Sequence, residues 1–148
     1  MLALASVRVE PNLRVETASK WALRKRWIGI SAEARAMLAM AVLANASRTS
    51  PPAELLRLAS PERLREATAW GLATRLCRRF TGAGPQAILN SALTIEPMAG
   101  GSARLVLAVR ANMVSLYNEV VEKDLRLLAD CLGLPGVFRP VPDHATLP

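Results

Sequence analysis

The 148-residue chain has few of the residue types that build catalytic and metal sites, with two cysteines and one histidine. Cys77 and Cys131 cannot form a disulfide framework, and no second Cys or His lies near either at metal-ligand spacing. Both cysteines fall on the apolar stripes of expected helices, so we expect buried, small apolar side chains in a reducing compartment. His144 lies in a proline-rich tail, which favours a solvated residue over a general base or metal ligand.

Long apolar runs and aromatic residues are also scarce. The longest apolar stretch, residues 36–44, is far shorter than the ~18 residues that a membrane span needs, so we expect a cytoplasmic protein without a span. The apolar run 1–5 is too short for a secretory signal and is typical of a core element, which suggests a fragment of a longer protein. Aromatic residues are too few for a base-stacking platform, so specific nucleic-acid binding is not expected. We expect Trp21, Trp27 and Trp70 to be core or interface anchors.

No catalytic motif is visible in the sequence. Glu62 and Glu66 share a helical face, but their place in the first turns of a helix favours a role in dipole compensation and solubility. A phosphate-binding loop follows a strand and opens a helix, and neither glycine-rich segment, 82–84 or 100–101, does so. We therefore assign no catalytic residue, no metal ligand and no cofactor to this chain.

Positive charge is the feature that the sequence has in excess, since 19 basic and 12 acidic residues give a net charge of +7. Residues 1–80 carry 14 basic and 6 acidic residues, a net charge of +8, whereas residues 81–148 carry 5 and 6, a net charge of −1. Two clusters end expected helices: Lys20, Arg24, Lys25 and Arg26, and Arg75, Arg78 and Arg79. Two interpretations of these clusters stay open. The cations can bind phosphate, or they can compensate the negative charge at the helix C-termini.

Periodicity predicts a mostly helical α+β fold with a small antiparallel hairpin or three-stranded sheet. Long helices are expected from about Pro11 to Arg24, from Ser31, from Pro61 and from Asn112, with a short helix at 52–58. The hairpin is expected at about residues 88–110, turning at Gly100 and Gly101, and residues 136–141 can add a short edge strand. We expect residues 1–141 to form a single domain and residues 142–148 to form a disordered tail.

Five segments occur in an order that resembles a known family. They are residues 7–14 (VRVEPNLR), 27–30 (WIGI), 58–61 (LASP) before a long helix, the hairpin 93–109, and 120–125 (VVEKDL) before a Leu-Gly-Leu at 132–134. Their order and spacing resemble the C-terminal region of the bacterial exopolyphosphatase and guanosine pentaphosphate phosphohydrolase family, over residues 7 to about 141. The resemblance implies a degenerate helical module similar to a His-Asp domain.

The departures from that family concern the catalytic parts. Its phosphatase chemistry lies in N-terminal actin-like domains with glycine-rich phosphate loops and acidic residues that bind Mg²⁺, and this sequence contains none of these. Glu10, Pro11 and Asn12 stand where the family has His-Pro-Asp, and Asn45 and Ala46 stand where it often has a basic residue and a His.

The resemblance therefore implies an accessory domain that is not catalytic by itself. Such a domain would bind polyphosphate or a phosphorylated nucleotide through the two basic clusters. It would also aid dimerisation, and its protein partner would be either a second copy of the chain, in a homodimer, or an actin-like phosphatase domain on which it docks. The alternative is a structural domain for protein–protein interaction that binds no anion. Trp21, Trp27 and the apolar start would then be interface residues.

Overall fold

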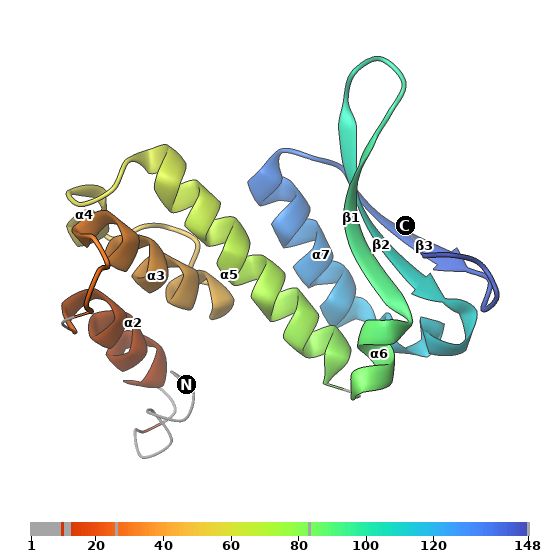
Figure 1. Cartoon of the computed structure of the whole chain (residues 1–148), viewed down its shortest axis with the longest axis horizontal. Coiled ribbons are helices and arrows are strands. Elements are labelled where there is room, and N and C mark those ends of the chain that lie inside the picture. The colour runs from red at the N-terminus through yellow and green to blue at the C-terminus, as the bar shows by residue number, and fades with distance from the viewer. Residues whose placement is uncertain (1–9, 11–12, 26, 83, 148) are drawn as a thin grey trace. The chain divides into compact units, whose positions relative to one another are not determined.

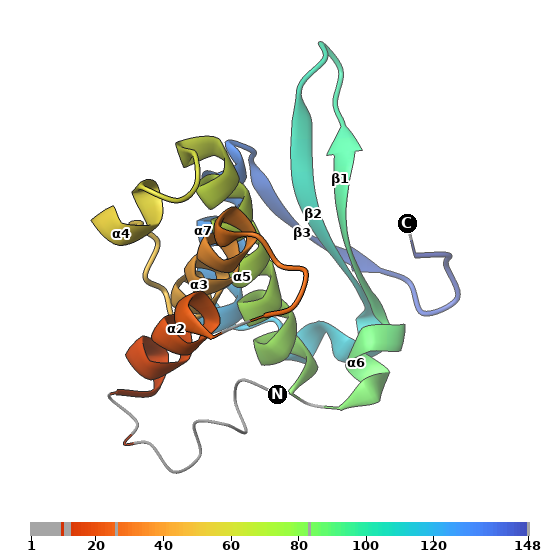
Figure 2. The ribbon, with the colours of Figure 1, turned by 60° about the vertical axis from the view of Figure 1, so that its left-hand side comes forward.

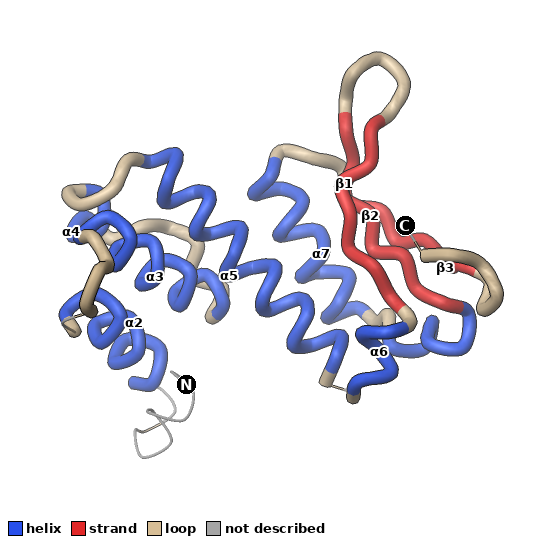
Figure 3. The backbone as a smooth tube through the Cα atoms, viewed as in Figure 1, coloured by secondary structure: helices blue, strands red, loops and turns tan. Residues whose placement is uncertain are grey.

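The computed structural model describes residues 10, 13–25, 27–82 and 84–147 (Figure 1). The chain divides into two compact units, residues 1–74 and 75–148, where the sequence analysis expects one domain over residues 1–141. The described residues form a mostly helical α+β fold with a small three-stranded sheet, which confirms the predicted class (Figure 3). No helix within the described part of the chain has the length and apolar character that a membrane crossing requires.

The first unit is helical. It contains α2 (Arg14–Arg24), α3 (Ala32–Asn45), α4 (Ala53–Leu56) and the beginning of α5 (Pro61–Thr81). The Ser31 side chain accepts a hydrogen bond from the Ala34 N–H at 3.1 Å, which confirms the predicted start of the second long helix. Helix α3 packs against α2, and its side chains Met37 and Met40 are buried, as expected for a helix that is apolar on most sides.

Helix α5 approaches α3 closely at Gly71. A Cβ atom built on Gly71 would lie 2.3 Å from the Ala41 carbonyl oxygen and 2.6 Å from the Ala44 Cβ, both on α3. Because real contacts of this kind are much longer, no side chain fits at this position without a shift of one helix. The close packing of the first unit therefore depends on a glycine that the sequence pattern does not single out.

The second unit builds the sheet. After the end of α5 come α6 (Pro85–Leu89), β1 (Ser91–Pro97), β2 (Ala103–Arg110), the 3₁₀ helix η2 (Ala111–Leu116), α7 (Glu119–Leu132) and β3 (Gly136–Val141). Strand β2 lies in the centre, antiparallel to β1 and parallel to β3, so the sheet is mixed (Figure 2). The parallel pair requires a crossover, and α7 provides it. The predicted hairpin and the predicted edge strand at 136–141 are both confirmed.

Both faces of β2 are covered, since all residues from Leu105 to Val109 are buried. Helix α7 contacts β2 and β3. Val106, Ala108 and Val141 form a separate buried cluster, on which Ala145 and Leu147 pack. Residues 142–147, for which the sequence predicts disorder, thus cover part of the sheet. The Asp143 carboxylate also accepts a hydrogen bond from the Asn112 N–H at 3.0 Å.

Two element boundaries differ from the prediction. Ile88, expected to begin the first strand, belongs to α6, because Pro85 starts a short helix there. Asn112, expected to cap the last long helix, lies in η2. Asn118 caps that helix instead, accepting hydrogen bonds from the Val120 and Val121 N–H groups at 3.0 and 3.1 Å. Val120, in the first turn of α7, is exposed.

Burial corrects two further expectations. The sequence predicts that Cys77 is buried, but its side chain is exposed. Leu76 and Phe80, on the same helix, face the core of the second unit instead. Cys131 is half-buried. Trp70 is also exposed and is not a core residue, so only its second expected role, as an interface residue, remains.

Candidate functional site

Two tryptophans organise the chain where α2 ends. The rings of Trp21 and Trp27 meet edge to face, with centroids 4.9 Å apart and planes at 84°. The Trp27 indole N–H donates a hydrogen bond of 3.0 Å to the Ala22 carbonyl in the last turn of α2. Gly29, with φ of +77°, then allows the chain to turn toward α3. These contacts hold Trp27, which follows α2 in sequence, against the helix end.

Lys25 lies against this aromatic pair. Its Nζ atom is 4.4 Å from the ring centroid of Trp21 and 5.8 Å from that of Trp27. A cation in this position is attracted to the faces of aromatic rings by about 0.5–1 kcal/mol at an exposed site. The side chain of Lys25 nevertheless stays exposed. The aromatic pair therefore orients a positive charge without neutralising it.

The neighbouring cations form weak, exposed ion pairs. Lys20 Nζ lies 2.7 Å from Glu16 Oε1, and this contact holds the pKa of the Glu16 carboxyl below its usual range. Arg24 Nη2 lies 3.5 Å from Glu54 Oε1. Exposed pairs of this kind contribute about 0–1 kcal/mol each, so a ligand with several negative charges can replace such partners. We call Lys20, Arg24 and Lys25 the α2 basic turn; Arg26, the fourth predicted member, lies outside the described residues.

The second predicted cluster has a different environment. Arg75 Nε lies 2.9 Å from Asp124 Oδ1, and Arg79 Nη1 lies 3.1 Å from Asp124 Oδ2. The Asp124 side chain is only 2% exposed, so the two arginines neutralise a buried carboxylate and connect α5 to α7. Breaking such a pair costs several kcal/mol. Arg78 is exposed, and among the ion pairs of the described residues Asp124 pairs with Arg75 and Arg79 but not with Arg78. Arg75 and Arg79 therefore have a structural role.

The sheet carries a third group of charges. Glu96 on β1 accepts hydrogen bonds from Arg139 on β3 at 2.6 Å and from Arg104 on β2 at 3.1 Å. The hydrogen bond from Arg139, above all, holds the pKa of Glu96 below its usual range. The hairpin register places Glu96 directly opposite Arg104, so the sequence contained a signal for this pair. The network connects all three strands.

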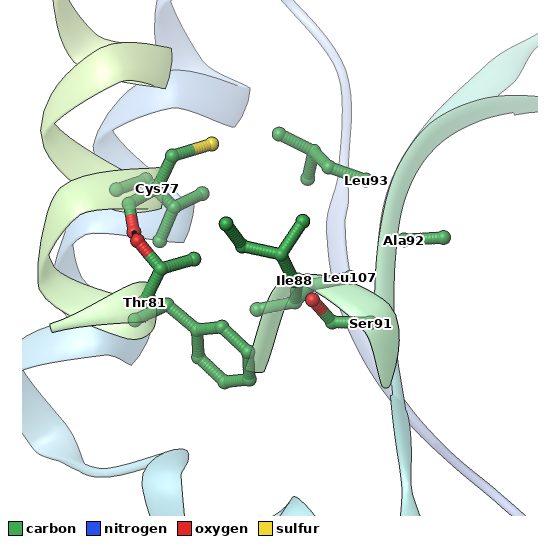
Figure 4. Close-up of a pocket in the computed structure, with 9 residues that line it drawn as sticks. Cys77, Thr81, Ile88, Ser91, Ala92, Leu93 and Leu107 are labelled. Carbon is green, nitrogen blue, oxygen red and sulfur yellow. Dashed lines mark hydrogen bonds between the residues drawn. The ribbon is translucent and has the colours of Figure 1, made fainter. Parts of the chain in front are cut away.

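An apolar cavity of about 300 Å³ lies in the second unit (Figure 4). It is lined mainly by apolar side chains from α5, α6, β1 and β2, namely Leu76, Phe80, Ile88, Leu93 and Leu107. The Thr81 and Ser91 hydroxyls at this cavity donate hydrogen bonds to the Cys77 and Ala87 carbonyls, at 2.7 and 2.6 Å. The cavity therefore offers little to orient a polar substrate.

Within the described residues, no group of three or more His, Cys, Asp or Glu side chains could hold a metal ion. Of the sequence-predicted site, the structure brings Lys20, Arg24 and Lys25 together at the end of α2, and it joins Arg75 and Arg79 to Asp124, which the sequence analysis did not single out. The i,i+4 spacing of Trp21 and Lys25 is the sequence signal that could have identified their contact. No protein-family model matches the chain, and neither does any curated protein.

Proposed function

We propose that the chain is an accessory domain of an exopolyphosphatase-like phosphohydrolase, not catalytic by itself, that binds polyphosphate or another phosphorylated anion and associates with a second copy. Its helical unit would correspond to a degenerate module similar to a His-Asp domain. The order of the sequence segments and the net positive charge of residues 1–80 support this proposal. The observation that carries it is the α2 basic turn, where the tryptophan pair holds an exposed lysine.

The α2 basic turn suits a phosphate chain better than the cluster on α5. Arg24 can contact phosphate oxygens with two N–H groups at once, and Lys25 offers a compact point charge. An incoming phosphate must compete only with exposed carboxylates for Lys20 and Arg24, and ion pairs of this kind are weak because water screens them. For Arg75 and Arg79 the competitor is a buried carboxylate, whose loss of partners costs several kcal/mol. We therefore place the anion at α2.

A salt-dependent titration tests the site. Long-chain polyphosphate is titrated into the wild type and into the double variant R24A/K25A at about 50 and 200 mM salt, with tryptophan fluorescence as the signal. We expect the double variant to bind at least about tenfold more weakly and with a shallower salt dependence, because two phosphate contacts and their released counterions are lost.

The control removes the same charge elsewhere. Arg57 and Lys123 are exposed and lie outside the α2 basic turn, so R57A/K123A should bind as the wild type does, apart from a small general effect of net charge. Binding without salt dependence, or an equal loss in both double variants, would contradict the assignment.

A second function, protein–protein interaction without anion binding, is favoured by exposed apolar side chains in the first unit. Ile28 is fully exposed, and Leu56 and Trp70 are each 47% exposed. Such residues are typical of interfaces when they gather in patches. A wild type that does not bind polyphosphate, and whose association with itself or another chain is weakened in W70A, would support this function over the first.

A further inference from the structure

Ile28 is the most exposed of the large apolar side chains in the described part of the chain, and it is fully exposed. It lies in the turn between α2 and α3, directly before Gly29, whose φ is +77°. A Cβ atom built on Gly29 would have nothing within 4 Å apart from its chain neighbours. The turn therefore presents an isoleucine at a tip that the described residues of the first unit leave uncovered.

The turn that carries Ile28 has a fixed support. Trp27, the preceding residue, donates a hydrogen bond of 3.0 Å to the Ala22 carbonyl, and its ring packs edge to face on Trp21. Both tryptophans are half-buried. A side chain that is already held in place loses little conformational freedom when it binds, so Ile28 is organised in advance for a contact with an apolar environment.

Positive charge surrounds the same turn. Residues 13–30 contain five basic residues and one acidic residue, a net charge of +4. Lys25 precedes Ile28 by three residues, so their Cα atoms are at most about 11 Å apart. The Lys25 Nζ atom lies over the tryptophan rings and forms no ion pair with a carboxylate within the described residues. A fully exposed apolar side chain and an uncompensated cation therefore lie about one Debye length apart.

Polyphosphate accounts for the cations but not for Ile28, because an inorganic anion has no apolar part. The surface of a bilayer that contains anionic lipids offers both, since phosphate groups lie directly above hydrocarbon. Tryptophan is enriched at this level of a membrane, where its ring meets hydrocarbon and its N–H meets polar groups. A single apolar group or a basic patch binds a membrane weakly, and the two together give a stable attachment.

We propose that the α2 basic turn and Ile28 attach the first unit to the surface of a membrane that contains anionic lipids. Lys20, Arg24 and Lys25 bind the lipid phosphates, and Ile28 inserts into the boundary between headgroups and acyl chains. Trp21 and Trp27 then lie at the level of the headgroups. Attachment of this kind requires no segment that crosses the bilayer.

This inference goes beyond the proposed function, because it uses the same cations but requires no bound polyphosphate. A wild type that binds polyphosphate but not anionic vesicles would overturn the membrane attachment alone. A wild type that binds the vesicles but not polyphosphate would overturn the proposed ligand alone. I28N should bind polyphosphate as the wild type does, since Ile28 carries no charge.

The first test is co-sedimentation of the wild type, I28N and I95N with vesicles. Ile95 on β1 is 58% exposed and lies in the second unit, so I95N makes the same substitution away from the α2 basic turn. The vesicles contain phosphatidylcholine alone or with about one third phosphatidylglycerol, at about 100 mM salt.

We expect the wild type and I95N to bind the mixed vesicles and to bind the neutral vesicles far more weakly. I28N should bind the mixed vesicles about tenfold more weakly than the wild type, because it loses the burial of one isoleucine side chain. Soluble glycerophosphate offers the same phosphate without acyl chains and should not displace the wild type at an equal phosphate concentration. Equal binding of all three proteins, no binding by the wild type, or full displacement by glycerophosphate would overturn the proposal.

The second test leaves Ile28 unchanged and is unaffected if I28N folds poorly. In W70F the two remaining tryptophans are Trp21 and Trp27, and the substitution is made at an exposed position. Mixed vesicles whose acyl chains are brominated near the headgroup should quench the fluorescence of W70F, and vesicles brominated at the ends of the chains should quench it much less. Fluorescence that is unchanged by both kinds of vesicle would overturn the insertion of this turn.

Discussion

Replacing Asp124 by alanine should destabilise the second unit strongly, because it leaves two arginines without their buried partner. The carboxylate is 2% exposed and lies 2.9 Å from Arg75 Nε and 3.1 Å from Arg79 Nη1. Removal of one partner from a buried ion pair costs about 3–5 kcal/mol. The Arg79 side chain is 40% exposed and can take up water in the variant, so we expect the lower end, about 3 kcal/mol.

Urea denaturation followed by far-UV circular dichroism measures this loss. With a slope of about 1.5 kcal/mol/M, a loss of 3 kcal/mol lowers the midpoint by roughly 2 M. Tryptophan fluorescence, recorded in parallel, reports on the first unit, since all three tryptophans lie within residues 1–74. The far-UV transition should therefore shift at least as much as the fluorescence transition.

The matched control is Asp130, an exposed aspartate on the same helix. D130A removes the same charge without a buried partner and should change the free energy of unfolding by less than about 0.5 kcal/mol. The double variant R75A/D124A should lose less than the sum of the two single losses, because both remove one interaction. A loss below about 1 kcal/mol in D124A, or an equal loss in D130A, would refute the structural role assigned to Arg75 and Arg79.

Two further predictions concern packing and pH. G71A should lower the free energy of unfolding by about 1–3 kcal/mol in urea titrations, because its Cβ would lie 2.3 Å from the Ala41 carbonyl oxygen. The control G82A, whose Cβ would have its nearest atom at 3.3 Å, should be nearly neutral. Equal effects of the two variants would contradict the close approach of α5 and α3. Glu96 has a lowered pKa, so the stability it contributes is present above its ordinary value of 4.5 and is lost as the pH falls through its folded-state pKa. The melting temperature of E96Q should therefore depend less on pH below about 4.5 than that of the wild type, and parallel pH profiles would argue against the Glu96 network.

Local sequence signals located most of the elements. Ser31 and the Ser60-Pro61 pair mark helix starts that the structure confirms, because a capping side chain bonds to backbone groups only three residues away. Gly100 and Gly101 mark the hairpin turn, and both have positive φ values that glycine adopts without strain. The prediction that the last long helix begins at Asn112 was wrong, because Asn118, an equally good capping residue, caps that helix instead. Which of them caps depends on the 3₁₀ helix that follows β2.

The sequence by itself determined the helical character, the hairpin, the edge strand and the concentration of positive charge in residues 1–80, since these follow from composition and short-range periodicity. Only the tertiary structure decided which of these cations are neutralised. Arg75 and Asp124 are 49 positions apart, so no local pattern indicates that they meet, and an aspartate among charged neighbours on α7 is equally typical of a solvated face. Burial of that single carboxylate separates the structural arginines of α5 from the exposed charges that end α2.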